Sequence, residues 1–114
     1  MKHFNHISEL EVEREQRGKL YLEFLRVSSM SAGLYVLSPG SADPQKPHKE
    51  DELYYVVRGQ GRMRVGREER DVNAGSVIFV EANEEHRFLD ITEDLTVLVF
   101  FAPPAGSLQG AVKK

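Results

Sequence analysis

The chain contains no cysteine in its 114 residues. Disulfide bonds, catalysis by a thiolate and metal binding through sulfur are therefore excluded. Any metal site would have to use histidine nitrogens and carboxylate oxygens. The chain has four histidines, which are His3, His6, His48 and His86.

Positive charge and long apolar segments are also scarce. Lysine and arginine total 15 against 18 acidic residues, which gives a net charge of −3. Without a basic excess there is little to neutralise phosphates, so we expect no nucleic-acid partner. The longest apolar run, at 95–104, includes Thr96 and is far shorter than the roughly 20 residues that span a membrane. The N-terminus has no apolar segment typical of a secretory signal, so we expect a cytoplasmic protein with no membrane partner.

The composition that remains is typical of one globular domain. Hydrophobic residues make up 40% of the chain and charged residues 29%, and the length is that of a single domain. We expect an N-terminal arm at 1–18, one domain at 19–104 and a C-terminal tail at 105–114. Ser8 followed by Glu11 resembles a helix capping box. This pattern leaves a short helix and a solvated arm as alternatives for the first segment.

From residue 19 onward the chain reads as short strands separated by turn signals. Gly59–Gly61 and 91–94 are among the predicted turns. The spacing predicts an antiparallel sandwich or small barrel with at most one short helix. About eight strands are expected, at 19–27, 32–38, 52–58, 62–65, 70–72, 76–80, 86–90 and 95–101.

Two of these segments, 76–80 and 95–101, are apolar on both faces. A sheet with one wet face would alternate between apolar and polar residues. The outer face should therefore be partly covered, either by the N-terminal arm or by a second subunit. We expect a homodimer.

Four polar residues precede the strongest strand at every second position: Lys46, His48, Glu50 and Glu52. In an extended segment such residues share one face, and Tyr54 continues that face toward the interior. This pattern indicates either a solvent face or the mouth of a pocket. The Cα atoms of His48 and Glu52 would lie about 13 Å apart if the segment were fully extended, so it must bend if both are to bind one ion.

His86 begins a later strand and shares a face with Phe88. Two histidines and a carboxylate from two strands could form a metal site. A lone histidine near a loop is more often a surface or hydrogen-bonded polar residue, so composition alone leaves both interpretations open. His3 and His6 lie in a polar terminal segment, and we expect no ligand role for them.

The spacing of these residues resembles the first motif of the cupin superfamily, and in particular its small single-domain conserved-barrel members. That motif is a glycine, five residues, H-x-H, three residues, a glutamate, six residues and a glycine. Gly40, His48, Glu52 and Gly59 match it, and Lys46 stands where the first histidine belongs.

The second motif of the family is P-x-G, two residues, a histidine, three residues and often an asparagine. Glu81, Ala82 and Asn83 stand where the family has P-x-G, and Asp90 takes the asparagine position. Only His86 and the spacing survive. The resemblance covers residues 33–101 and implies an antiparallel double-stranded β-helix, or jelly-roll barrel.

The resemblance also implies one divalent metal ion, Fe, Mn, Zn or Ni, bound by His48, Glu52 and His86. Family members usually have three histidines and one glutamate. A set of two histidines and one carboxylate with open positions still suits a non-haem Fe(II) or a catalytic Zn site. We expect Lys46, Glu50, Tyr54 and Phe88 to line the pocket.

Lys46 and Glu50 are the candidates for a catalytic role. Lys46 could point to solvent, bind an anionic substrate, or act as a base if burial made it neutral. Glu50 could supply a further oxygen ligand or pair with Lys46.

The function expected from the resemblance is metal-dependent chemistry on a small organic molecule. Dioxygenase, decarboxylase and isomerase activities all occur among cupins. The alternative is a non-catalytic binding or sensing protein, with or without metal, which the degenerate motifs favour. A third interpretation is a structural dimer with a vestigial pocket.

Overall fold

Segments rich in β-branched and aromatic residues form an antiparallel β-barrel in the computed structural model, which describes residues 2–44 and 46–108. The prediction of an all-β fold with one short helix is confirmed. The elements, in chain order, are α1 (Ile7–Gln16), β1 (Tyr21–Arg26), β2 (Ser31–Leu37), β3 (Asp51–Val65), β4 (Glu68–Asn73), β5 (Val77–Val80) and β6 (His86–Ala102).

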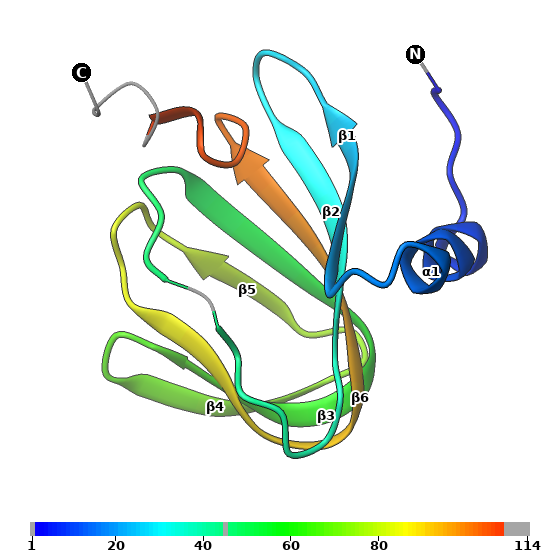
Figure 1. Ribbon diagram of the computed structural model, residues 1–114. Coiled ribbons are helices and arrows are strands. Elements are labelled where there is room, and N and C mark those ends of the chain that lie inside the picture. The colour runs from blue at the N-terminus through cyan, green and yellow to red at the C-terminus, as the bar shows by residue number, and fades with distance from the viewer. Residues whose placement is uncertain (1, 45, 109–114) are drawn as a thin grey trace.

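Two long strands, β3 and β6, run through both faces of the barrel. The strand order is β1-β2-β6-β3-β4, and β5 pairs with β3. The first half of β3 pairs with β5 and with the end of β6, whereas its second half pairs with β4 and the start of β6. β3 and β6 bend together where the two faces meet (Figure 1). The rolled sheet encloses a core that includes Leu37, Val56, Leu95 and Val97, all fully buried.

Two turns expected from the sequence are wrong. The segments 59–61 and 91–94 lie inside β3 and β6, which is why six strands are described instead of about eight. The pairing of β3 with β6 shifts register at three places between Val56 and Arg62, as β-bulges do. The glycines therefore mark the corner of one bent strand.

The N-terminal segment forms helix α1, which resolves the alternative of a helix or a solvated arm. Leu10 of α1 is buried against Leu22 and Leu34 on the outer face of β1 and β2. The helix lies outside the barrel beside these strands (Figure 1). Its N-cap is His6, whose Nδ1 accepts a hydrogen bond from the Ser8 backbone N–H at 3.2 Å, so the expected capping box at Ser8 is wrong.

The helix covers only part of the outer face. Leu98 of β6 packs against the cluster around Leu10. A second group of apolar side chains on β3 and β5 remains exposed, so the homodimer expected from the sequence stays a prediction for this surface. These side chains are Leu53, Tyr55, Val77 and Phe79, with Val77 at 63% exposure.

None of the described helices is long and apolar enough to cross a membrane. Of the expected C-terminal tail, residues 105–108 are described and the remaining six lie outside the described residues.

Candidate metal centre

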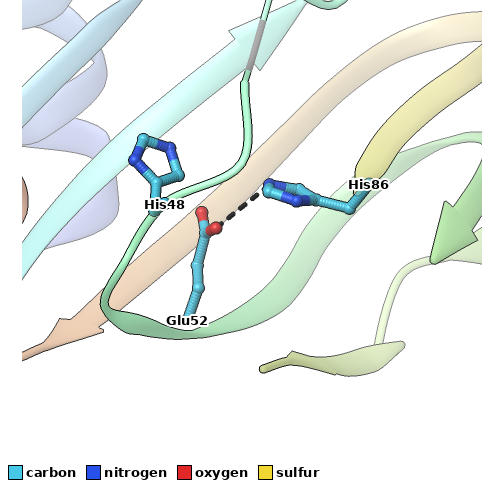
Figure 2. A group of neighbouring side chains, drawn as sticks. All are labelled: His48, Glu52 and His86. Atoms are coloured by element: carbon cyan, nitrogen blue, oxygen red, sulfur yellow. Dashed lines mark ion pairs between the residues drawn. The ribbon is translucent and has the colours of Figure 1, made fainter. Parts of the chain in front are cut away.

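Three side chains predicted from the sequence meet inside the barrel. His48 lies in the loop before β3, Glu52 is the second residue of β3, and His86 is the first residue of β6. The close-up shows these side chains side by side, with the Glu52 carboxylate directed at the imidazole of His86 (Figure 2). One ligand atom from each residue lies within 4.8 Å of those of the other two. Atoms that bind one ion through bonds of about 2 Å lie at most about 4 Å apart, so closing the site takes an adjustment of about an ångström.

The bend that the spacing required is present. Residues 46–48 are irregular, 49–50 form a bend, and regular strand begins only at Asp51. Two contacts hold this loop against the turn before β6. The His48 carbonyl accepts a hydrogen bond from the Asn83 N–H, and the Asp51 carboxylate accepts one from the Ala82 N–H at 3.0 Å.

Asn83 explains how the turn survives without the glycine of the family motif. Its φ is 68°, in the left-handed region that favours glycine. Asparagine tolerates this region better than most residues because its short polar side chain bonds locally. His86 therefore keeps its place although Pro and Gly of the second motif are absent.

The buried polar atoms at the centre of this cluster have no hydrogen-bond partner. Both carboxylate oxygens of Glu52 and Nε2 of His86 are inaccessible to solvent and make no hydrogen bond within the described residues. Oε1 and Nε2 are 3.1 Å apart, close enough for an ion pair but not aligned as a hydrogen bond. Unsatisfied buried charge is costly in a folded protein. Ligand atoms that face a common point in this way fit a bound cation.

The other ring nitrogen of His86 sets the tautomer that a metal requires. Nδ1 lies 3.0 Å from the Glu84 carbonyl oxygen, which can only accept a hydrogen bond. The proton is therefore on Nδ1, and Nε2 carries the lone pair in the neutral ring. Burial acts to lower the pKa of His86, but its contacts with Glu52 and the Glu84 carbonyl outweigh it, so the pKa is raised above its ordinary value.

The carboxylate of Asp43, which the sequence did not mark as a site residue, stabilises the position of the site residues through hydrogen bonds. Asp43 is buried and accepts hydrogen bonds from the Tyr35 hydroxyl at 2.8 Å and from the Phe88 backbone N–H at 2.9 Å. Burial, and then the hydrogen bond to Asp43, raise the pKa of Tyr35, so its hydroxyl remains a donor. Asp43 thus fixes the loop that carries His48 to the strand that carries His86.

Replacing Asp43 with alanine should lower the free energy of unfolding by about 3 kcal/mol, because it leaves a buried hydroxyl and a buried N–H without an acceptor. Chemical denaturation measures this change. Asp71→Ala is the matched control, since the Asp71 side chain is 89% exposed, and it should change stability by less than about 0.5 kcal/mol. Equal effects of the two substitutions would show that Asp43 does not hold the loop.

The remaining predicted site residues lie around the cluster, not within it. Lys46 is exposed, which provides none of the burial that a neutral lysine base requires. Glu50 is buried, but its Oε2 accepts a hydrogen bond from the Leu108 N–H at 3.0 Å and so holds the C-terminal turn. Tyr54 and Phe88 are fully buried core residues, and the Tyr54 ring packs 6.0 Å from that of His86. The shared face expected for 46–52 is wrong for Glu50, whereas Lys46 and His48 line one cavity and His48 and Glu52 converge.

A cavity of about 410 Å³ opens beside His48. The ring of Phe101 on its wall meets the His48 imidazole edge-on, with centroids 5.0 Å apart. Of the residues expected to line a pocket, Lys46 lies on this cavity, whereas Glu50, Tyr54 and Phe88 do not. The other walls come from separate segments that no sequence pattern brings together. The lining residues are Leu20, Tyr21, Tyr35, Pro44, Lys46, His48, Val99 and Phe101.

The rolled double sheet with a His-Glu-His cluster inside agrees with the comparison of the chain with known families, in which the Cupin domain matches residues 33–101. The chain belongs to the cupin family. The uncharacterized protein SCO3923 from Streptomyces coelicolor is 50% identical to this chain over 104 residues, which are 91% of this chain and 98% of the relative.

Solved structures show the same cupin fold. TT1209 from Thermus thermophilus superimposes with a TM-score of 0.76 at 26% identity, over 90% of this chain and 99% of that one. An RmlC-like cupin family protein with a double-stranded β-helix fold from Methanocaldococcus jannaschii gives a TM-score of 0.65 at 15% identity, over 73% and 78% of the two chains. The jelly-roll topology implied by the resemblance is thereby confirmed.

Proposed function

We propose that this cupin binds one divalent metal ion through His48, Glu52 and His86 and acts on a small organic molecule in the adjoining cavity. The observation that carries the proposal is the meeting of His48, Glu52 and His86, with the ligand atoms of Glu52 and His86 buried and without a hydrogen bond. Two imidazole nitrogens and a carboxylate are a donor set suited to Fe(II), Zn, Mn or Ni. Three protein ligands leave coordination positions open toward a substrate.

The chain's own residues supply most of what such a reaction needs. A divalent ion bound here would polarise an oxygen of the substrate. Glu84 holds the His86 ring in the ligand tautomer, and Asp43 holds the loop of His48 in place. Tyr54 and Phe88 are fully buried, and the Tyr54 ring packs against both His86 and Phe88 and so shields the His86 side of the site. The cavity beside His48 provides the approach for the substrate.

The test is elemental analysis of the purified protein followed by calorimetric titration of the chelator-treated protein with Mn, Fe, Ni and Zn salts. We expect one equivalent of metal to bind. If none of the four ions binds, the metal centre does not exist and the cupin is a metal-free binding protein.

Replacing Lys46 with histidine should tighten metal binding by about tenfold, because it restores the first histidine of the family motif beside His48. Lys46 is exposed, so the substitution should not disturb folding. Calorimetry of Lys46→His against Lys2→His, a matched change at an exposed position in the arm, measures the effect. An unchanged affinity would show that position 46 cannot reach the ion.

Metal binding should weaken on acidification from about pH 8 to about pH 6. The pKa of His86 is raised above 6.5 in the metal-free protein, so a proton competes for Nε2 at a higher pH than with an ordinary imidazole. Above that pKa Nε2 of His86 is deprotonated and its lone pair can bind a metal ion. Below it the ion must displace a proton, and affinity should fall by about tenfold per pH unit for each proton displaced. Calorimetry across this range checks the slope, and a flat profile would contradict a histidine ligand.

A further inference from the structure

The cavity beside the metal centre has two chemically different parts. Its walls are mostly apolar and aromatic, with Tyr35, Val99 and Phe101 among them. Its rim carries Lys46, and no carboxylate is among the described residues that line it. A volume of about 410 Å³ lies within the range of small-molecule sites.

Lys46 is the source of positive charge at this cavity. Its side chain is exposed and makes no salt bridge with any residue in the described ranges. Two carboxylates near the cavity, Asp43 and Glu52, are buried, at 3% and 2% exposure. A third, Glu23, is close enough to Tyr21 to act on it electrostatically, and it is ion-paired with Arg26 at 2.9 Å. Among the described residues that line the cavity, Lys46 is the only lysine, arginine, aspartate or glutamate, so the formal charge of the lining is positive.

A second polar group on the wall is unpaired. The Tyr21 hydroxyl is buried and has no hydrogen-bond partner among the described residues. Burial raises the pKa of Tyr21, so the hydroxyl stays protonated and able to donate. Buried hydroxyls are seldom left without a partner.

We propose that this cavity binds a small organic anion, a carboxylate with an apolar body, whose charged group meets Lys46 and whose body packs against Phe101 and Val99. The proposal deepens the function proposed above and depends on it only for placing the ligand beside a metal ion. Lys46 stands where cupins usually have a metal-binding histidine. In this chain the residue at position 46 selects a negatively charged ligand over a neutral one.

The probes are phenylacetate, its neutral isostere phenylacetamide, and acetate, which has the charge without the apolar body. Each is titrated calorimetrically into chelator-treated protein and into zinc-loaded protein. We expect phenylacetate to bind at least about tenfold more tightly than either of the other two probes, in both forms of the protein. Amide chemical shifts of Val99 and Phe101 should move with phenylacetate.

Substitutions at position 46 test the contribution of the lysine charge to ligand binding. Lys46→Met keeps the length of the side chain and should remove the preference for phenylacetate over phenylacetamide, whereas Lys46→Arg should retain it. Lys2→Met, which removes a lysine from the exposed arm, should bind as the wild type does. Equal binding of acid and amide by the wild type, unchanged phenylacetate binding by Lys46→Met, or no detectable phenylacetate binding would each overturn the proposal.

The outcomes separate this proposal from the metal centre. If phenylacetate binds through Lys46 while no metal binds, the anion site stands and the proposed function fails. If metal binds but the preference for the acid persists in Lys46→Met, the metal centre stands and the anion site at Lys46 is wrong.

Discussion

Replacing His86 with alanine should lower the affinity for divalent ions by more than about 100-fold. Even residues that only orient a metal ligand cost about 10- to 100-fold when they are removed, and this substitution removes one of only three ligands. Nε2 of His86 is buried and lies 3.1 Å from Glu52 Oε1, so the substitution removes a ligand atom from inside the cluster. Calorimetric titration with zinc, the ion with the least demanding geometry, measures the loss.

His3→Ala is the matched control, because it makes the same chemical change at an exposed position in the arm. It should bind metal as the wild type does. Glu52→Gln tests the same centre without leaving a hole, since glutamine has nearly the volume of glutamate but lacks its charge. Both His86→Ala and Glu52→Gln should also lose metal-dependent thermal stabilisation, which is worth about 2.7 kcal/mol at a ligand concentration of about 100 times Kd. If His86→Ala binds zinc as tightly as the wild type, the assignment of the centre is wrong.

The members of this cluster could be predicted because their spacing matches the two cupin motifs, each of which is local in the sequence. Glu52 is four residues after His48, and His86 opens a strand whose start is marked by a turn. These are properties of short segments. The support from Asp43 could not be found in this way, because the residue sits in a loop rich in proline, serine and glycine and looks solvent-exposed. Its partners lie 8 and 45 residues away.

The strands show the same contrast: their positions follow from nearby residues, whereas their bends depend on strands that are distant in the sequence. Turn signals between apolar segments located most strands, but not which face of each strand is buried. In the first half of β3 Tyr54 and Val56 are buried while Leu53 and Tyr55, equally apolar, are exposed. Whether Gly59 and Gly61 begin a turn or a bulge depends on a strand more than 30 residues away, since Gln60 pairs with Glu93 of β6. A pair of glycines around one polar residue is compatible with both structures.

Gly59→Ala should lower the free energy of unfolding by about 3 kcal/mol. The φ of Gly59 is +104°, in a region that costs a residue with a side chain about 1–2 kcal/mol. A Cβ atom there would also clash with the backbone carbonyl oxygen of Asp94 and lie 2.7 Å from the Cα atom of Leu95. Both belong to β6 and cannot rotate away, so the strands must separate at the bulge, as in an overpacked core, at a further cost of about 1–3 kcal/mol.

Gly75→Ala separates the two causes of this loss. Gly75 has a similar φ of +95°, but a Cβ atom there would meet nothing within 4 Å. It should therefore lose only the conformational part, about 1–2 kcal/mol. Chemical denaturation of both variants at one pH gives the comparison. A Gly59→Ala protein no less stable than Gly75→Ala would mean that β3 and β6 do not approach closely at this corner, and that the barrel bends elsewhere.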